Sequence, residues 1–160
     1  GPYPLSYNGW GDVLVIVFFG FVPVGGTYYV QALTWTPDVT IASLICGLLI
    51  ATLLVVNNYR DREADARSGK RTVIVRFGEK FGRYFYLMLG ITASLLCLCF
   101  LREGHFSAAF LPQLYLIPHF HTWKRMVKIY SGKKLNSILG ETSRNMLLMG
   151  ILIAIGMLIN

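Results

Sequence analysis

The sequence has few acidic residues, few charges of either sign and very little cysteine. Of 160 residues, 8 are Asp or Glu and 15 are Lys or Arg, so 14% are charged, whereas 54% are hydrophobic. Soluble domains carry about 25% charged residues, so this composition indicates a protein whose solvent is the membrane. Cys46, Cys97 and Cys99 lie in apolar stretches, and their odd number favours packing roles over a disulfide or a metal site.

Long apolar windows with few or no charges follow one another along the chain. In order, they are 12–33, 39–56, 84–101, 106–123 and 146–159. About 20 helical residues cross roughly 30 Å of hydrocarbon, so the first four windows are long enough to span a membrane. The last becomes long enough if its helix begins near Thr142. The sequence predicts one all-α domain, residues 1–160, built as a polytopic transmembrane bundle with about five spans.

The positive charge is concentrated in two loops. Eight basic residues lie between Arg60 and Arg83 and six between Lys124 and Arg144, which leaves only Arg102 elsewhere. With five spans both basic loops fall on the same side of the bilayer, and the positive-inside rule assigns that side to the cytoplasm. We therefore expect membrane lipid, and not nucleic acid, as the partner of this charge. Attraction to anionic lipid is the simplest role for the second loop.

The most polar stretch, NNYRDREADARSGKRT at residues 57–72, directly follows an uncharged window. If the helix continues past Val56, then Asn57, Asp61 and Asp65 recur every fourth residue and lie on one face. Two carboxylates at this spacing repel each other unless a cation lies between them. Mg²⁺ takes oxygen ligands from one or two carboxylates and completes its shell with water and substrate phosphate. The spacing is therefore suited to a diphosphate held through Mg²⁺ by Asp61 and Asp65.

The basic residues that follow the two acids fit the same ligand. Arg67, Lys70 and Arg71 are suited to phosphate oxygens, Arg through its fork of donors and Lys as a point charge. Gly69 gives the backbone the freedom to end the helix and turn these bases back toward the acids.

A simpler interpretation of the same stretch is a solvated helix end. Glu63 and Arg67 stand four residues apart, and Arg62 can reach Asp65, so ordinary surface ion pairs would account for the charges. The spacing alone leaves both interpretations open, because two Asp four residues apart are common by chance.

A resemblance favours the metal interpretation. Residues 57–65 (NNYRDREAD), 69–72 (GKRT) and 75–78 (VRFG) resemble the second aspartate-rich motif of the UbiA superfamily of intramembrane aromatic prenyltransferases. The narrower resemblance is to the 1,4-dihydroxy-2-naphthoate polyprenyltransferases of menaquinone synthesis. The features that match this branch are residues 1–5 (GPYPL), Tyr7, Gly9, Gly11, 18–20 (FFG), 135–136 (LN) and Thr142. The resemblance covers nearly the whole chain.

The resemblance implies a reaction and a set of site residues. Mg²⁺ held by two aspartate-rich motifs would bind the diphosphate of an allylic prenyl donor, whose departure leaves a carbocation that an electron-rich aromatic ring attacks. Residues carried over by position are Asp61 and Asp65 as metal ligands, Asn57 as a further contact, and Lys70 and Arg71 as diphosphate contacts. A dry cavity would keep water from the cation.

The same resemblance implies that part of the site lies elsewhere. Tyr3, in the opening segment, is the expected contact for the aromatic acceptor. The family has about nine spans and a first motif of the form N-D-x-x-D-x-x-x-D, and this sequence has neither. We therefore expect residues 1–160 to be the C-terminal half of a UbiA-like domain in a bacterial inner membrane, with the N-terminal half as its partner. The alternatives are another aromatic acceptor, or a membrane scaffold or transporter component with a lipid-binding basic loop.

Overall fold

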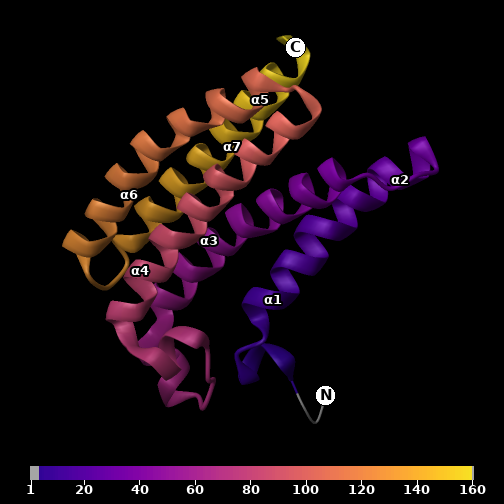
Figure 1. Cartoon of the computed structure of the whole chain (residues 1–160). Coiled ribbons are helices and arrows are strands. Elements are labelled where there is room, and N and C mark those ends of the chain that lie inside the picture. Colours follow the sequence, from indigo (N-terminus) through magenta and orange to yellow (C-terminus); the bar gives the residue numbers. More distant parts are fainter. Residues whose placement is uncertain (1–3, 160) are drawn as a thin grey trace.

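The computed structural model describes residues 4–159, and every regular element among them is helical (Figure 1). The elements are η1 (Leu5–Asn8), α1 (Gly11–Ile16), η2 (Val17–Gly25), α2 (Gly26–Ala32), α3 (Pro37–Arg67), α4 (Val73–Leu96), η3 (Cys97–Glu103), α5 (Phe106–Phe110), η4 (Leu111–Tyr115), α6 (Leu116–Ile129) and α7 (Leu135–Ile159). They form five helical arms, α1–η2–α2, α3, α4–η3, α5–η4–α6 and α7, that run back and forth along one bundle. The predicted all-α bundle is confirmed.

Four of the arms are long and apolar enough to cross a membrane. They are Gly11–Ala32, Pro37–Arg67, Val73–Glu103 and Leu135–Ile159. The last helix begins at Leu135, well before Thr142, and so gains the length that its apolar window lacked. The remaining arm, Phe106–Ile129, is helical but does not belong to these four, and it carries polar residues such as Gln113 and His121.

The long helix α3 is the centre of the bundle. It packs against α4, against α1 and η2, and against α7. Its fully buried Val55, Val56 and Tyr59 share one core cluster with Tyr86 of α4 and Ile138 of α7. In a bilayer the lipid tails are as apolar as this core, so close packing and interhelical hydrogen bonds, more than removal from water, hold such helices together.

The first arm approaches α3 through two glycines. A Cβ added to Gly20 in η2 would lie 2.4 Å from the carbonyl oxygen of Ser43, and one added to Gly47 would lie 2.8 Å from the Cα of Ile16. Real Cβ atoms do not come so close, so only glycine allows the two backbones to meet here. This contact fixes the first arm against the N-terminal half of α3.

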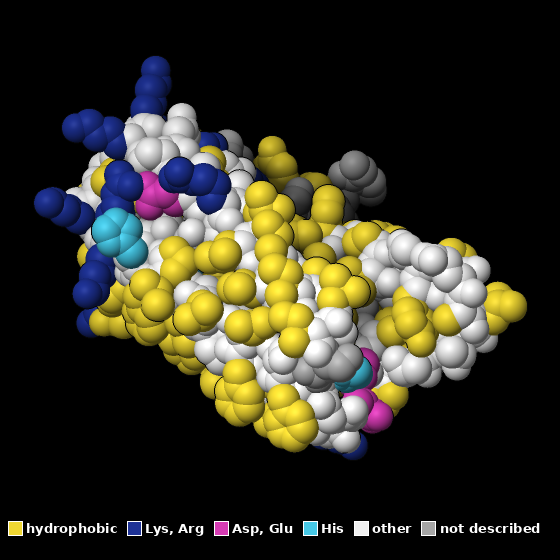
Figure 2. Space-filling model, turned by 90° about the horizontal axis from the view of Figure 1, so that it is seen from above, with side chains coloured by type: hydrophobic (Ala, Val, Ile, Leu, Met, Phe, Trp, Pro, Cys, Tyr) yellow, Lys and Arg dark blue, Asp and Glu magenta, His cyan; other side chains and the backbone are white. Residues whose placement is uncertain are grey.

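The chain reversals sort the charges to one end of the bundle. Loops 68–72 and 130–134 lie at the same end, and turns 33–36 and 104–105 lie at the other (Figure 1). The second loop is tied to the last turns of α3, because Arg62 donates a hydrogen bond to the carbonyl oxygen of Tyr130 at 3.2 Å. Lys and Arg side chains crowd this basic end, whereas hydrophobic side chains cover much of the flank (Figure 2).

Candidate functional site

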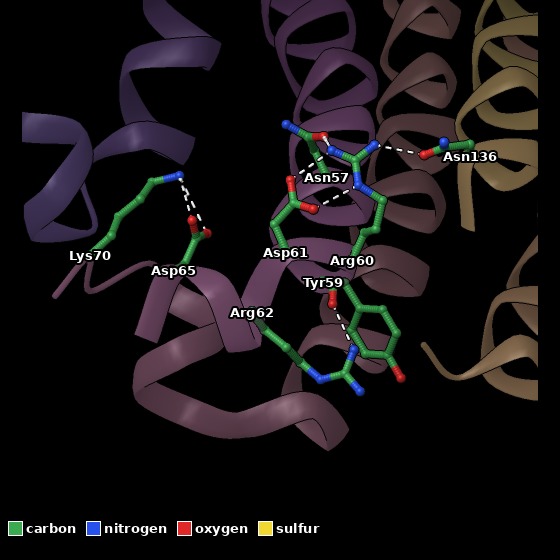
Figure 3. A network of polar contacts seen from close by, with 8 residues as sticks. All are labelled: Asn57, Tyr59, Arg60, Asp61, Arg62, Asp65, Lys70 and Asn136. Atoms are coloured by element: carbon green, nitrogen blue, oxygen red, sulfur yellow. Dashed lines mark hydrogen bonds and ion pairs between the residues drawn. The ribbon is translucent and has the colours of Figure 1, made fainter. Parts of the chain in front are cut away.

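The candidate site lies where α3 continues beyond its uncharged segment. The helix runs without a break to Arg67, as the spacing of the acids requires. Asn57, Asp61 and Asp65 therefore lie on successive turns of one helix, and Figure 3 shows their side chains. The predicted shared face of these three residues is present at the basic end of the bundle.

A glycine turn ends α3 and folds the chain back onto Asp65. Arg67 is the last residue of the helix and Ser68 is its C-cap, and the following Gly69 has φ +76°, a conformation that favours glycine. The N–H of Gly69 donates to the carbonyl of Ala66 at 3.2 Å, and that of Lys70 donates to the carbonyl of Asp65 at 2.9 Å. This pair of bonds is the Schellman arrangement of helix ends. The predicted turn at Gly69 therefore exists.

The same turn brings the side chain of Lys70 back to the acid. Its Nζ lies 3.4 Å from Oδ1 and 3.3 Å from Oδ2 of Asp65, an ion pair whose side chains are mostly shielded from solvent (Figure 3). Lys70 and Asp65 are thus joined through both backbone and side chains. A basic residue predicted to contact diphosphate already lies beside a residue predicted to hold the metal.

Arg60 holds the other acid. Its Nε and a terminal nitrogen donate to the two carboxylate oxygens of Asp61 at 2.7 and 2.6 Å. The guanidinium also donates to the Oδ1 atoms of Asn57 at 2.6 Å and of Asn136 at 2.8 Å (Figure 3). Since Asn136 belongs to α7, this network ties the two helices together at the site. No role was predicted for Arg60 or Asn136, because the bond between them depends on how α7 packs on α3.

The other residues predicted to bind substrate make fewer side-chain contacts among residues 4–159. Arg67 is exposed, and its side chain makes no hydrogen bond or ion pair with residues 4–159. The side chain of Arg71 is exposed as well, but its backbone N–H donates to the carbonyl of Tyr7 at 2.9 Å, which pins the opening segment to the loop. Arg76 adds a second tie, to the carbonyl of Asn8 at 2.8 Å. Tyr3 lies outside the described residues.

The surface ion pairs of the simpler interpretation do not form among the described residues. Arg62 turns away from Asp65, donates to the backbone carbonyl of Tyr59 at 2.7 Å and pairs with Glu79 at 3.4 Å. Glu63 and Arg67 are both exposed and make no ion pair with each other. The two ion pairs expected from the simpler interpretation are therefore absent among residues 4–159.

The loop beyond α6 joins the same cluster of charges. Tyr130 follows α6, and its hydroxyl hydrogen-bonds to the carboxylate of Glu79, which raises the pKa of that hydroxyl above its usual value. Arg83 donates to the hydroxyl of the buried Tyr59 at 2.9 Å and pairs with Glu79 at 3.2 Å. These contacts hold the loop beyond α6 against α3 and α4, and they give Tyr59 a structural role.

A third acid was not predicted for this site. Asp12, in the first turn of α1, is 8% exposed, and its Oδ1 has no hydrogen-bond partner among residues 4–159. It lines a cavity of about 50 Å³ together with Asn58 and Lys70. The only sequence signal was a single acid at the start of an apolar span, a position where charged residues are costly and so commonly functional.

The oxygen donors fit half of a magnesium site. Among residues 4–159 no three His, Cys, Asp or Glu side chains are close enough together to hold a metal ion. Mg²⁺ needs only one or two protein carboxylates, with water and substrate phosphate as its other ligands. Asp61 and Asp65, one turn apart, provide two carboxylates, and the amide oxygen of Asn57 lies one turn further along. The chain's own cations, Arg60 and Lys70, now neutralise these carboxylates.

Comparison with known proteins gives one consistent group. The family described as "UbiA prenyltransferase family" matches residues 2–158. The 1,4-dihydroxy-2-naphthoate octaprenyltransferase of Haemophilus influenzae is 35% identical over 163 residues, which cover 99% of this chain and 52% of that protein. The protein of the same name from Escherichia coli is 42% identical over 98 residues, covering 61% of this chain and 32% of that protein.

A more distant relative extends the same picture. The 2-carboxy-1,4-naphthoquinone phytyltransferase of Synechocystis is 30% identical over 81 residues, which cover 51% of this chain and 26% of that protein. No solved structure matches the chain significantly. The chain spans about half the length of the curated relatives that it matches along its whole length.

Proposed function

This chain belongs to the UbiA prenyltransferase family, and from that premise we propose that it forms part of an enzyme of menaquinone biosynthesis. The enzyme would transfer a polyprenyl group from an allylic prenyl diphosphate to an aromatic quinone precursor, 1,4-dihydroxy-2-naphthoate. The observation that carries the proposal is the pair Asp61 and Asp65 on one face at the end of a membrane-length helix, with Lys70 folded back beside them. The acceptor follows the printed names of the relatives.

Each charged residue then has a task in binding the diphosphate. Asp61 and Asp65 would hold Mg²⁺, which neutralises the leaving diphosphate and so stabilises the separation of charge. Arg60 and Lys70 would release the acids and turn to phosphate oxygens, where charge-assisted hydrogen bonds are strong. Arg67 and Arg71 are exposed at the same end and would contact the outer phosphate. Asn57 would orient the metal shell through its amide oxygen.

Apolar cavities beside α3 suit a long prenyl tail. A cavity of about 250 Å³ is lined by Ala42, Ile45 and Leu49 of α3 together with residues of η2 and α7. A second cavity of about 590 Å³ shares Val24 and Ala42 with it and continues toward the opposite end of the bundle, where Asp38 and Glu103 also line it. An apolar wall of this kind excludes water, which would otherwise capture an allylic cation.

The distribution of charge supports an orientation in the membrane. Both basic loops lie at the end of the bundle that carries the acids, whereas Arg102 lies at the other end. The positive-inside rule then places the aspartate-rich end in the cytoplasm, where the diphosphate head group of the donor would be in contact with water. The membrane would be the bacterial inner membrane.

Two aspartates are half of the ligand set that the family implies. The sequence contains no N-D-x-x-D-x-x-x-D motif. We propose that a segment outside residues 1–160, the N-terminal half of the same fold, supplies these ligands and closes the site. Residues 1–160 alone would then bind prenyl diphosphate weakly and not turn it over.

The test is transfer in membranes from the native source, where all parts of the enzyme are present. A labelled prenyl diphosphate and 1,4-dihydroxy-2-naphthoate are incubated with and without Mg²⁺, and prenylated product is measured. Asp61→Asn should lower the rate at least about 100-fold at unchanged protein level, because it removes a metal ligand. Glu63→Gln, which removes an exposed charge from the same helix, should leave the rate within about twofold. Equal rates in the two variants would refute the proposal.

A further inference from the structure

A polar cleft separate from the aspartate site lies on the flank of the bundle, between α6 and α7. It has a volume of about 430 Å³. Its lining residues are Ile117, Pro118, His121, Thr122, Arg125, Glu141, Arg144 and Asn145. None of them belongs to the aspartate site, and the proposed transfer reaction uses none of them.

The floor of the cleft is fixed by hydrogen bonds. Asn145 donates to the hydroxyl of Thr122 at 2.9 Å, and both side chains are buried. Arg125 donates to Oε1 of Glu141, which is 8% exposed in its side chain. The two helices are therefore joined by polar contacts at this level.

Arg144 is the unusual residue of the cleft. It lies within a helix long and apolar enough to span a membrane, it is exposed, and its side chain makes no hydrogen bond or ion pair with residues 4–159. At 1.5 Å per residue it lies about 14 Å along the axis from the start of α7 at Leu135. A charged residue so placed in a spanning segment is expected to have a partner.

The two arginines converge on the same level. Side chains of a helix lean toward its N terminus, and α6 and α7 run in opposite directions. Arg144 therefore leans toward the basic end of the bundle, and Arg125 leans away from that end. Both border one cleft, and Glu141 offsets one of their two charges, which leaves a net charge of +1 on these three side chains.

The surroundings of the cleft are apolar. Ile117, four residues before His121, is 71% exposed, and Leu147, three residues after Arg144, is 65% exposed. In a bilayer these side chains contact acyl chains, while the cleft above them lies near the head-group layer. A ligand that fits would have one negative charge joined to hydrocarbon.

We propose that this cleft binds the phosphodiester head group of an anionic glycerophospholipid, with Arg144 and Arg125 as the contacts of its phosphate. One negative charge on the phosphate balances the net charge of the cleft. The forked donors of Arg144 meet two phosphate oxygens, and the exposed apolar residues contact the acyl chains. This site is distinct from the general attraction of the basic loops for anionic lipid.

The test uses the protein as its source makes it, purified in neutral detergent and stripped of lipid. Phosphatidylglycerol is titrated in, and the lipid-bound fraction is measured by native mass spectrometry. Arg144→Gln should weaken binding about tenfold, since a hydrogen bond to a charged group is lost, and Arg144→Lys should weaken it less. The matched control Lys133→Gln removes a charge from the neighbouring loop, outside the cleft, and should change binding less than about twofold.

Three outcomes would overturn the proposal. Equal weakening by Arg144→Gln and Lys133→Gln would mean that only general surface charge attracts the lipid. Displacement of phosphatidylglycerol by an equal concentration of inorganic phosphate would mean that the site takes a soluble anion. Absence of any bound lipid in the unmutated protein would mean that another protein segment covers the cleft.

Discussion

Two carboxylates stand one helical turn apart at the end of α3, and each is neutralised by a cation that the chain itself supplies. Arg60 reaches Asp61 from the same helix, whereas Lys70 reaches Asp65 only because the chain reverses at Gly69. The proposed metal ion would have to compete with both cations. Since partly exposed ion pairs contribute only about 0–1 kcal/mol, this competition would be weak.

The reversal at Gly69 gives a prediction for a single residue. Gly69→Ala should lower the free energy of unfolding by about 1 kcal/mol, because φ +76° disfavours a residue with a Cβ, although no atom stands in its way. Thermal unfolding in detergent measures the change. Gly140→Ala is the matched control, since a Cβ there meets open space within α7 and should raise stability. A decrease of equal size in both variants would contradict the role given to the turn.

For single residues, the spacing of the acids was the part of the sequence that predicted the structure. Asn57, Asp61 and Asp65 share a face because helix geometry alone decides it. The bond from Arg60 to Asn136 could not be predicted, since it depends on how α7 packs on α3. Asp12 was missed for the same reason, because its burial results from the contact of the first arm with α3.

Small residues determine how closely the helices of the bundle approach one another. Gly20 and Gly47 bring the first arm into backbone contact with α3. Gly90 of α4 lies under the ring of His119, where a Cβ would come within 2.2 Å of Nε2. The other ring nitrogen of His119, Nδ1, hydrogen-bonds to the hydroxyl of Tyr115 at 2.9 Å, so this histidine is a packing residue between helices.

The contact of the first arm with α3 gives a prediction for that element. Gly20→Ala should separate η2 from α3 and lower the free energy of unfolding by about 1–3 kcal/mol, the usual cost of overpacking. It should also make the loop near Arg71 more accessible to protease, because the opening segment is tied to that loop. Gly26→Ala, where a Cβ meets nothing within 4 Å, should do neither. Intact packing in the Gly20 variant would show that the close approach is not required.

The extents of the elements were less predictable than their number. The apolar window at 146–159 suggested a late start, but the helix begins at Leu135, because residues of its polar first turns pack against α3 and α6. Leu135 and Ile138 are fully buried in the core. An apolar window indicates only the part of a helix that contacts lipid. A helix end that packs on protein needs no long apolar run, so hydropathy does not predict where it begins.

At the scale of the whole molecule the charges define two ends. Fourteen of the 15 basic residues lie in or beside the loops at the aspartate end, as the sequence predicted. The positions of these loops in the bundle follow from the alternation of the helical arms (Figure 1). Which end faces the cytoplasm stays a prediction.

Cysteine accessibility tests that orientation. Ser131→Cys lies in the second basic loop and Thr34→Cys in the opposite turn, and both positions are exposed. In intact cells a membrane-impermeant maleimide should label the cysteine at residue 34, and it should label that at residue 131 only after permeabilisation. The native cysteines, which lie in the apolar helices, provide the unlabelled background. The reverse pattern would place the aspartates outside the cell.

The arm from Phe106 to Ile129 bears on how the protein enters the membrane during synthesis. The first arm is apolar enough to span alone, with 11% of its most apolar window buried by other helices. The fourth arm is not, yet it contacts α4 and α7 on either side. An insertion machinery that judges each segment by its own hydropathy would reject it. We therefore expect it to leave the translocon together with a neighbour, as a hairpin in which Gln113 is already hydrogen-bonded to Ser94 of α4.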